Sequence, residues 1–146
     1  MEENTRREFL QNLSFFLVGS IPIVSLFNGC ALTGLVSYRA KSSNGIVALD
    51  VGSILELSEI GNAIQLDGEN FSDSIIIAKL NEHNFIALSP ICSHLGCTVR
   101  KEGSFFRCPC HGSTYSLEGN VVKGPAEEQL KIFQTEFSNG KLIIHL

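Results

Sequence analysis

The feature that most constrains this chain is a cluster of cysteine and histidine residues in two short segments. Four of the five cysteines fall within 19 residues, in Cys92-Ser-His94-Leu-Gly-Cys97 and in Cys108-Pro-Cys110-His111. The first segment offers a thiolate and an imidazole two positions apart, and the second offers the same pair three positions apart. Two facing loops of this kind predict a closed site with four metal ligands.

The ligand types alone leave the metal open. Two cysteines and two histidines also form structural zinc sites, so a zinc module is one hypothesis. Such a site would leave the thiols of Cys97 and Cys110 unused, although each stands beside a ligand pair. The surplus cysteines therefore count against zinc, without excluding it.

Taken together, the two segments resemble the signature of the Rieske iron–sulfur family, C-x-H-L-G-C followed by C-P-C-H-G-S. The resemblance implies one 2Fe-2S cluster per chain. Its ligands would be Cys92 and Cys108 on one iron and His94 and His111 on the other. It also implies a disulfide between Cys97 and Cys110. Imidazole ligands make the cluster less negative than thiolates do, which raises its reduction potential.

Three further positions match high-potential members of the family. Ser113 and Tyr115 fall where those members place hydroxyl donors to a bridging sulfide and to a ligand cysteine sulfur. Such hydrogen bonds stabilise the reduced cluster and raise the potential further. Leu95 is expected to form an apolar cover at the histidine edge. Because low-potential Rieske ferredoxins generally lack the disulfide and the hydroxyl pair, the resemblance favours the quinol-oxidising class.

The chain departs from that class in two places. The 13 residues between His94 and Cys108 are fewer than in mitochondrial and chloroplast members, which predicts a trimmed cluster-binding tip. Gly124-Pro-Ala126 matches the start of the family's proline loop, but Glu127 stands where a second proline is usual.

The N-terminal region is apolar and carries no charged side chain from Phe9 to Tyr38. Residues 15–36 are long enough for a single-pass transmembrane anchor. Ahead of them, residues 1–14 contain Arg6-Arg7-Glu-Phe-Leu, which resembles a twin-arginine export signal. Export and a disulfide both predict a head outside the cytoplasm, on the periplasmic side of a bacterial cytoplasmic membrane. Cys30 faintly resembles a lipid-attachment site, and an uncleaved anchor is favoured over it.

The remaining residues predict an all-β domain. Residues 37–46 are polar and end in a turn signal, so a flexible linker is expected there. Residues 47–146 would form the Rieske domain, an antiparallel β-sandwich head with a small cluster-binding part at about 90–126, preceded by one transmembrane helix. Strands are expected from β-branched runs at 46–49, 63–66, 74–80, 85–88, 131–137 and 141–146, with a hairpin at Asn139-Gly140.

These observations predict electron transfer rather than catalysis by the chain alone. A net charge of -4 argues against nucleic acid as a partner. The leading hypothesis is the iron–sulfur subunit of a cytochrome bc-type complex, with cytochrome b, a c-type cytochrome, quinol and the membrane as partners. His94 or His111 would accept a hydrogen bond and a proton from quinol. Two alternatives are the small subunit of an arsenite-oxidase-like molybdenum enzyme and a free-standing anchored Rieske carrier.

Overall fold

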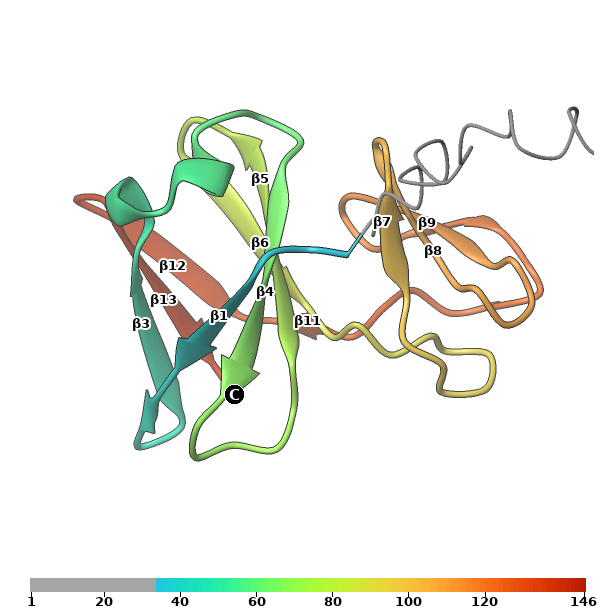
Figure 1. Ribbon diagram of the computed structural model, residues 1–146, viewed down its shortest axis with the longest axis horizontal. Helices are drawn as coiled ribbons and strands as arrows, with labels where there is room; N and C mark the ends of the chain where they lie inside the picture. Colours follow the sequence, from blue (N-terminus) through green and yellow to red (C-terminus); the bar gives the residue numbers. More distant parts are fainter. Residues whose placement is uncertain (1–33) are drawn as a thin grey trace, which may run out of the picture. The chain divides into compact units, whose positions relative to one another are not determined.

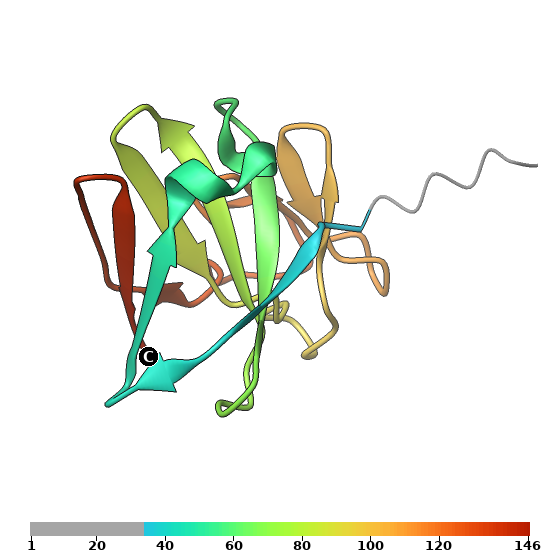
Figure 2. The same cartoon turned by 60° about the vertical axis from the view of Figure 1, so that its left-hand side comes forward.

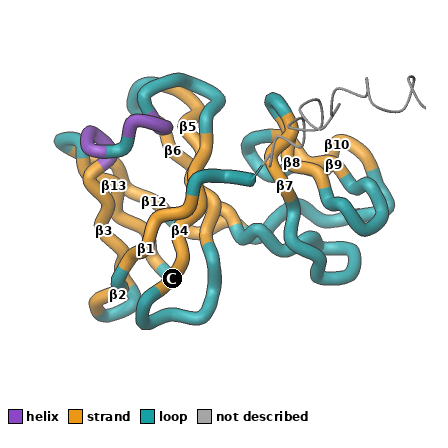
Figure 3. Tube along the Cα trace, viewed as in Figure 1, coloured by secondary structure: helices purple, strands orange, loops and turns teal. Residues whose placement is uncertain are grey.

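The computed structural model describes residues 34–146, which fold mostly into short β-strands (Figures 1 and 3). The strands are β1 Ser37–Ala40, β2 Ser42–Ser43, β3 Ile46–Asp50, β4 Ala63–Gly68, β5 Ile75–Asn81, β6 Asn84–Leu88, β7 Arg100–Glu102, β8 Phe105–Arg107, β9 Thr114–Ser116, β10 Val121–Lys123, β11 Ile132–Phe133, β12 Thr135–Ser138 and β13 Lys141–His145. Two 3-10 turns, η1 Val51–Ser53 and η2 Leu55–Leu57, follow β3. The expectation of a mostly β fold is confirmed.

Two sheets form a base lobe. One has the strand order β1-β4-β5-β6-β11 and the other β12-β13-β3-β2. Their inward side chains meet in a core that contains Val47, Leu66, Leu142 and Ile144, all fully buried. On β13 the buried Leu142 and Ile144 alternate with more exposed neighbours, as a half-buried strand requires.

A third sheet, with the order β10-β9-β8-β7, forms a smaller cluster-binding lobe. Its core contains Phe106, Tyr115 and Leu130, each fully buried, and reaches the back of β5. On that strand Ile75 and Ile77 pack in the base core, whereas Ile76 and Ala78, on the opposite face, pack in the core of the cluster-binding lobe. This explains why the strand reads as a continuous apolar run, since a strand with both faces covered needs no polar side.

Most expected strands are present, with one instructive difference. The run expected as one strand at 131–137 is interrupted at Gln134, so β11 pairs with β6 while β12 pairs with β13. The β12–β13 hairpin turns at Asn139 and Gly140, with φ values of 51° and 77°, as the Asn-Gly dipeptide predicts (Figure 2). The four short strands of the cluster-binding sheet were not expected.

The prediction of a flexible linker at residues 37–46 is wrong. β1 pairs in parallel with β4, and β2 pairs with β3, so most of this segment is part of the base sheets (Figure 2). The parallel pair is also a departure from a wholly antiparallel head. Polar side chains hold the segment in place, because the Ser37 hydroxyl donates to Asp67 and the Tyr38 hydroxyl donates to Glu56 at 2.5 Å.

The end of the expected anchor also needs correction. Leu35 packs against the core of the cluster-binding lobe, and the Val36 carbonyl accepts a hydrogen bond from the Gln65 amide at 2.9 Å. These two residues therefore belong to the head, not to a membrane span. The predicted signal region at 1–14 and the anchor up to residue 33 lie outside the described residues. From residue 34 onward, no helix has the length and apolar character that crossing a bilayer needs.

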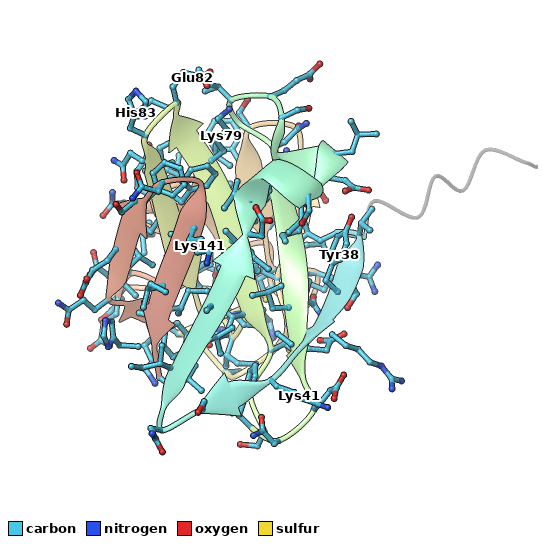
Figure 4. All side chains as sticks on the ribbon, turned by 90° about the vertical axis from the view of Figure 1, so that its left-hand side faces the viewer. Tyr38, Lys41, Lys79, Glu82, His83 and Lys141 are labelled. Atoms are coloured by element: carbon cyan, nitrogen blue, oxygen red, sulfur yellow. A yellow bond between two sulfur atoms is a disulfide. The ribbon has the colours of Figure 1, made fainter. Side chains whose placement is uncertain are left out.

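One lysine is buried in the base lobe. Lys79 on β5 is 6% exposed, and its ammonium group donates to the Ser58 carbonyl at 2.9 Å and to Glu82 at 3.1 Å. Figure 4 shows Lys79 at the same end of the head as Glu82 and the exposed His83. Because both partners are close, this charge is compensated and serves to hold the η2 turn against the β5–β6 hairpin.

Candidate metal centre

Two loops of the cluster-binding lobe share one hydrogen-bond pattern. In the first, the Cys92 amide donates to the Cys97 carbonyl at 2.8 Å, and the Gly96 amide donates to the Cys92 carbonyl at 2.9 Å. The same separations recur in the second, where the Cys108 amide donates to the Ser113 carbonyl at 2.8 Å. The Gly112 amide then donates to the Cys108 carbonyl at 3.0 Å. The loops are therefore two copies of one turn.

The pattern explains why each loop has a glycine four residues after its cysteine. Gly96 and Gly112 have φ values of 77° and 78°, in the left-handed region where a side chain is strained. The repeated Cys-to-Gly spacing was visible in the sequence as a signal of paired turns, but it was not used.

A disulfide joins the loops. Cys97 and Cys110 are bonded, with their Cα atoms 6.5 Å apart, as the resemblance implied. Cys92 and Cys108 are free and each only 2% exposed. The Cys108 sulfur lies within 4.8 Å of both disulfide sulfurs. Since a sulfur in a disulfide is not a thiolate ligand, Cys108 is the one member of that group able to bind metal.

The two histidines lie together at the tip of these loops. The His94 and His111 ring centroids are 4.9 Å apart, with the rings nearly perpendicular. His94 is half-buried and His111 is exposed. The Nδ1 atom of His94 is buried and has no hydrogen-bond partner among the described residues. A buried imidazole nitrogen without a partner is costly unless it binds a metal, so the site fits the expected cluster.

Tyr115 and Ser113 reach the site from β9 and the loop before it. The Tyr115 hydroxyl is 3.1 Å from the Cys92 sulfur, and the Tyr115 side chain is fully buried. The buried Ser113 hydroxyl oxygen accepts from the Ala126 amide at 3.0 Å, which leaves its own proton free to donate. The Tyr115 hydroxyl thus lies against a ligand-candidate sulfur, and the donation from Ser113 to cluster sulfide stays a prediction.

Burial and hydrogen bonding act in opposite directions on Cys92. Burial raises the pKa of its thiol, but hydrogen bonds from the Tyr115 hydroxyl and the His94 amide, among others, bring the pKa below its ordinary value. Burial first, and then the contact with Cys92, raises the pKa of Tyr115. The tyrosine therefore keeps its proton and can act as a donor.

Leu95 and the proline loop follow the two candidate ligand segments. Leu95 is 69% exposed, and its role as an apolar cover at the histidine edge stays a prediction. A pocket of about 340 Å³ beside His94 is lined by Ser93, Pro125, Glu127 and Glu128. Ser93 was missed by the sequence reasoning: its hydroxyl donates to the Glu128 carbonyl at 2.6 Å. A serine between two expected ligands gives no sequence signal of such a role.

Comparison with known proteins agrees with this geometry. A family model described as "Rieske [2Fe-2S] domain" matches residues 51–134. The cytochrome b6-f complex iron-sulfur subunit of Chlorobaculum tepidum is 32% identical over 143 residues, covering 97% of this chain and 75% of the relative. Subunit 1 of the same name from Nostoc sp. PCC 7120 is 28% identical over 148 residues, covering 95% and 83%.

A solved structure gives the same result. The plasma membrane Rieske protein PetC3 from Synechocystis PCC 6803 is 26% identical, covers 57% of this chain and 86% of its own, and superposes with a TM-score of 0.51. The structure titled hyperthermophilic respiratory Complex III, at 21% identity and a TM-score of 0.54, shares the fold. The matched range holds both cysteine–histidine loops, the disulfide and β9. The chain therefore belongs to the Rieske [2Fe-2S] family.

Proposed function

We propose that this chain is the iron–sulfur subunit of a cytochrome b6-f- or bc-type complex, taking one electron and one proton from quinol and passing the electron to a c-type cytochrome. The observation that carries the proposal is the buried Tyr115 hydroxyl 3.1 Å from the Cys92 sulfur. A donor to ligand sulfur raises the reduction potential, as quinol oxidation requires. Relatives that match 95–97% of the chain carry the name of such a subunit.

Four residues are proposed as the cluster ligands, namely Cys92, His94, Cys108 and His111. When bound, the cluster supplies reversible one-electron oxidation and reduction. Cys92 and Cys108 are buried, so they hold one side away from water, whereas the histidines lie at the tip. With the buried Nδ1 of His94 on the metal, its Nε2 remains to accept a hydrogen bond and a proton from quinol. His111 offers a second exposed imidazole for the same purpose.

The pocket beside His94 supports this site for quinol. It has a volume of about 340 Å³ and opens at the edge where the imidazole lies. Leu95, 69% exposed, adds an apolar side chain at the same tip, suited to contact with a quinol ring or the subunit that binds it. Residues 34–146 contribute these groups to one side of a quinol site, so we expect quinol oxidation to need cytochrome b and the chain not to be catalytic alone.

The membrane placement rests on the sequence. We propose that residues 1–14 form a twin-arginine signal, and that the apolar run from residue 15 ends ahead of Gly34 as a single-pass anchor. The head would then lie on the periplasmic side. Replacing Arg6 and Arg7 by lysines should block export of the assembled head. Normal accumulation outside the cytoplasm in that variant would refute the targeting assignment.

Co-purification of the tagged full chain from native membranes tests the proposal. Companion cytochrome b and c-type cytochrome subunits, together with a Rieske EPR signal after ascorbate reduction, are the expected result. A molybdopterin subunit as companion would replace the proposal by the small subunit of an arsenite-oxidase-like enzyme. If the chain purifies without companion subunits, it would be a free-standing carrier. A Cys92→Ser variant, which removes a proposed ligand, is the matched control and should lose the EPR signal. Zinc without EPR signal would refute the redox role altogether.

A further inference from the structure

The Tyr115 hydroxyl has more neighbours than it has protons. It lies 3.1 Å from the Cys92 sulfur and 3.1 Å from the Ser93 hydroxyl oxygen, and it accepts from the Ser93 amide at 3.2 Å. A tyrosine hydroxyl carries one proton. The distances therefore leave two acceptors at equal range, and which of them receives the proton depends on Ser93.

The Ser93 proton is already committed. Its hydroxyl lies 2.6 Å from the Glu128 carbonyl, which can only accept, and this is shorter than its 3.1 Å distance to Tyr115. At the contact with Tyr115, Ser93 is then the acceptor. A cysteine that binds metal is a thiolate and also accepts. The single Tyr115 proton is consequently shared between the serine oxygen and the cysteine sulfur.

We propose that Ser93 is a positioning residue that competes with Cys92 for the Tyr115 proton and so keeps the reduction potential of the cluster lower than Tyr115 could otherwise set it. The inference rests on the proposed ligand role of Cys92. A hydrogen bond to sulfur stabilises the reduced cluster more than the oxidised one, because the reduced cluster is more negative. Drawing the proton toward Ser93 weakens that stabilisation.

The surrounding contacts keep the competition in place. The bond from Ser93 to Glu128 fixes the serine rotamer at one end of the proline loop. The bond from the Ala126 amide to Ser113 fixes the same loop two residues earlier. Tyr115 is fully buried in the core of the cluster-binding lobe and cannot turn away. Both acceptors are thus held at fixed distances from the donor.

Reduction potentials of the full-length, cluster-loaded protein test the proposal by protein-film voltammetry. Ser93→Ala should shift the midpoint to a more positive value, because the Tyr115 proton then belongs to Cys92 alone. Ser93→Thr keeps the hydroxyl and should match the wild type. Thr and Val have nearly the same shape, so Ser93→Val should lie above Ser93→Thr. The comparison of Ser93→Thr with Ser93→Val replaces the alanine test if the Ser93→Ala variant loses its cluster.

A Tyr115→Phe background separates competition from a looser proline loop. Without the tyrosine proton, Ser93→Ala and Ser93→Val should leave the midpoint unchanged. A positive shift that persists in that background would mean that water has entered, and would overturn the proposal. An absent or negative shift in the Tyr115 protein would also overturn it. EPR spectra separate failure of the cluster assignment from failure of the role of Ser93. If no variant gives a Rieske signal, the cluster assignment fails. If the spectra are intact but the potential shifts in the wrong direction, only the role of Ser93 is refuted.

Discussion

The disulfide between Cys97 and Cys110 should stabilise the cluster-binding lobe locally, and its removal can be given a size. The bond links cysteines 13 residues apart. For a closed loop of this length, the entropy removed from the unfolded lobe corresponds to about 3 kcal/mol at room temperature. In the cluster-free protein the Cys97→Ala/Cys110→Ala variant should therefore open its two loops more readily by about that amount, or roughly 150-fold.

Amide hydrogen exchange measures this opening one segment at a time. The amides of Cys92 and Cys108, which hold the two loop turns, should exchange roughly 150-fold faster in the double variant. Amides of β5, whose bonds lie in the base sheet, should keep their wild-type rates. Reducing the wild-type protein is a matched chemical control, because Cys110 is exposed to the reagent, and it should reproduce the variant.

The cluster-loaded protein provides the contrast. Because the cluster would join the same two loops, the disulfide has less freedom left to remove there, and the variant should differ from the wild type by much less. Equal exchange in the cluster-free wild type and variant would refute the reasoning. So would an equal increase in β5, since that result would make the disulfide a support of the whole head.

Three further predictions follow from single contacts. Ser113→Ala should lower the midpoint potential by about 40 mV in voltammetry, since losing a donor of about 1 kcal/mol costs that much at 59 mV per 1.4 kcal/mol; an unchanged value would remove its tuning role. Gly119→Ala should reduce the free energy of unfolding in urea by about 2 to 4 kcal/mol, because φ is 87° and the new Cβ would lie 2.9 Å from Leu88. Gly140→Ala, at φ 77° with open space around it, should lose only about 1 kcal/mol, and equal losses would contradict the clash. Hydrogen bonds, that from Ser37 first, lower the pKa of Asp67, so its contribution to stability is present above about pH 4 and is lost as the pH falls further; Asp67→Asn should flatten this acid limb in thermal melts, and an unchanged limb would refute the assignment.

The pairing of the two cysteine–histidine loops was predictable because their residues lie at short, fixed spacings. Cys92 with His94, and Cys108 with His111, are each close enough in sequence to meet without knowledge of the fold. Strands with β-branched runs were predictable for a similar local reason. The three-residue strands β7 to β10 were not, since so short a segment carries too little alternation to detect.

The predictions that failed concern residues whose hydrogen-bond partners lie far away in the sequence. Ser37 and Tyr38 look like linker residues, yet their hydrogen-bond partners Asp67 and Glu56 are 30 and 18 residues further along. Only the fold brings these groups together. Ser93 was missed for the same reason, because its partner is the backbone carbonyl of Glu128, 35 residues later, and a carbonyl leaves no trace in a sequence.

The position of β5 between two cores has a consequence for how the protein delivers electrons. Ile75 and Ile77 pack in the base core, and Ile76 and Ala78 pack in the core of the cluster-binding lobe. Rotation of one lobe against the other would therefore disrupt the packing on both faces of β5. The cluster-binding lobe is thus joined rigidly to the base lobe. We therefore expect the distance from this lobe to an electron donor or acceptor, and hence the rate of transfer, to depend on where the whole head docks rather than on bending within it.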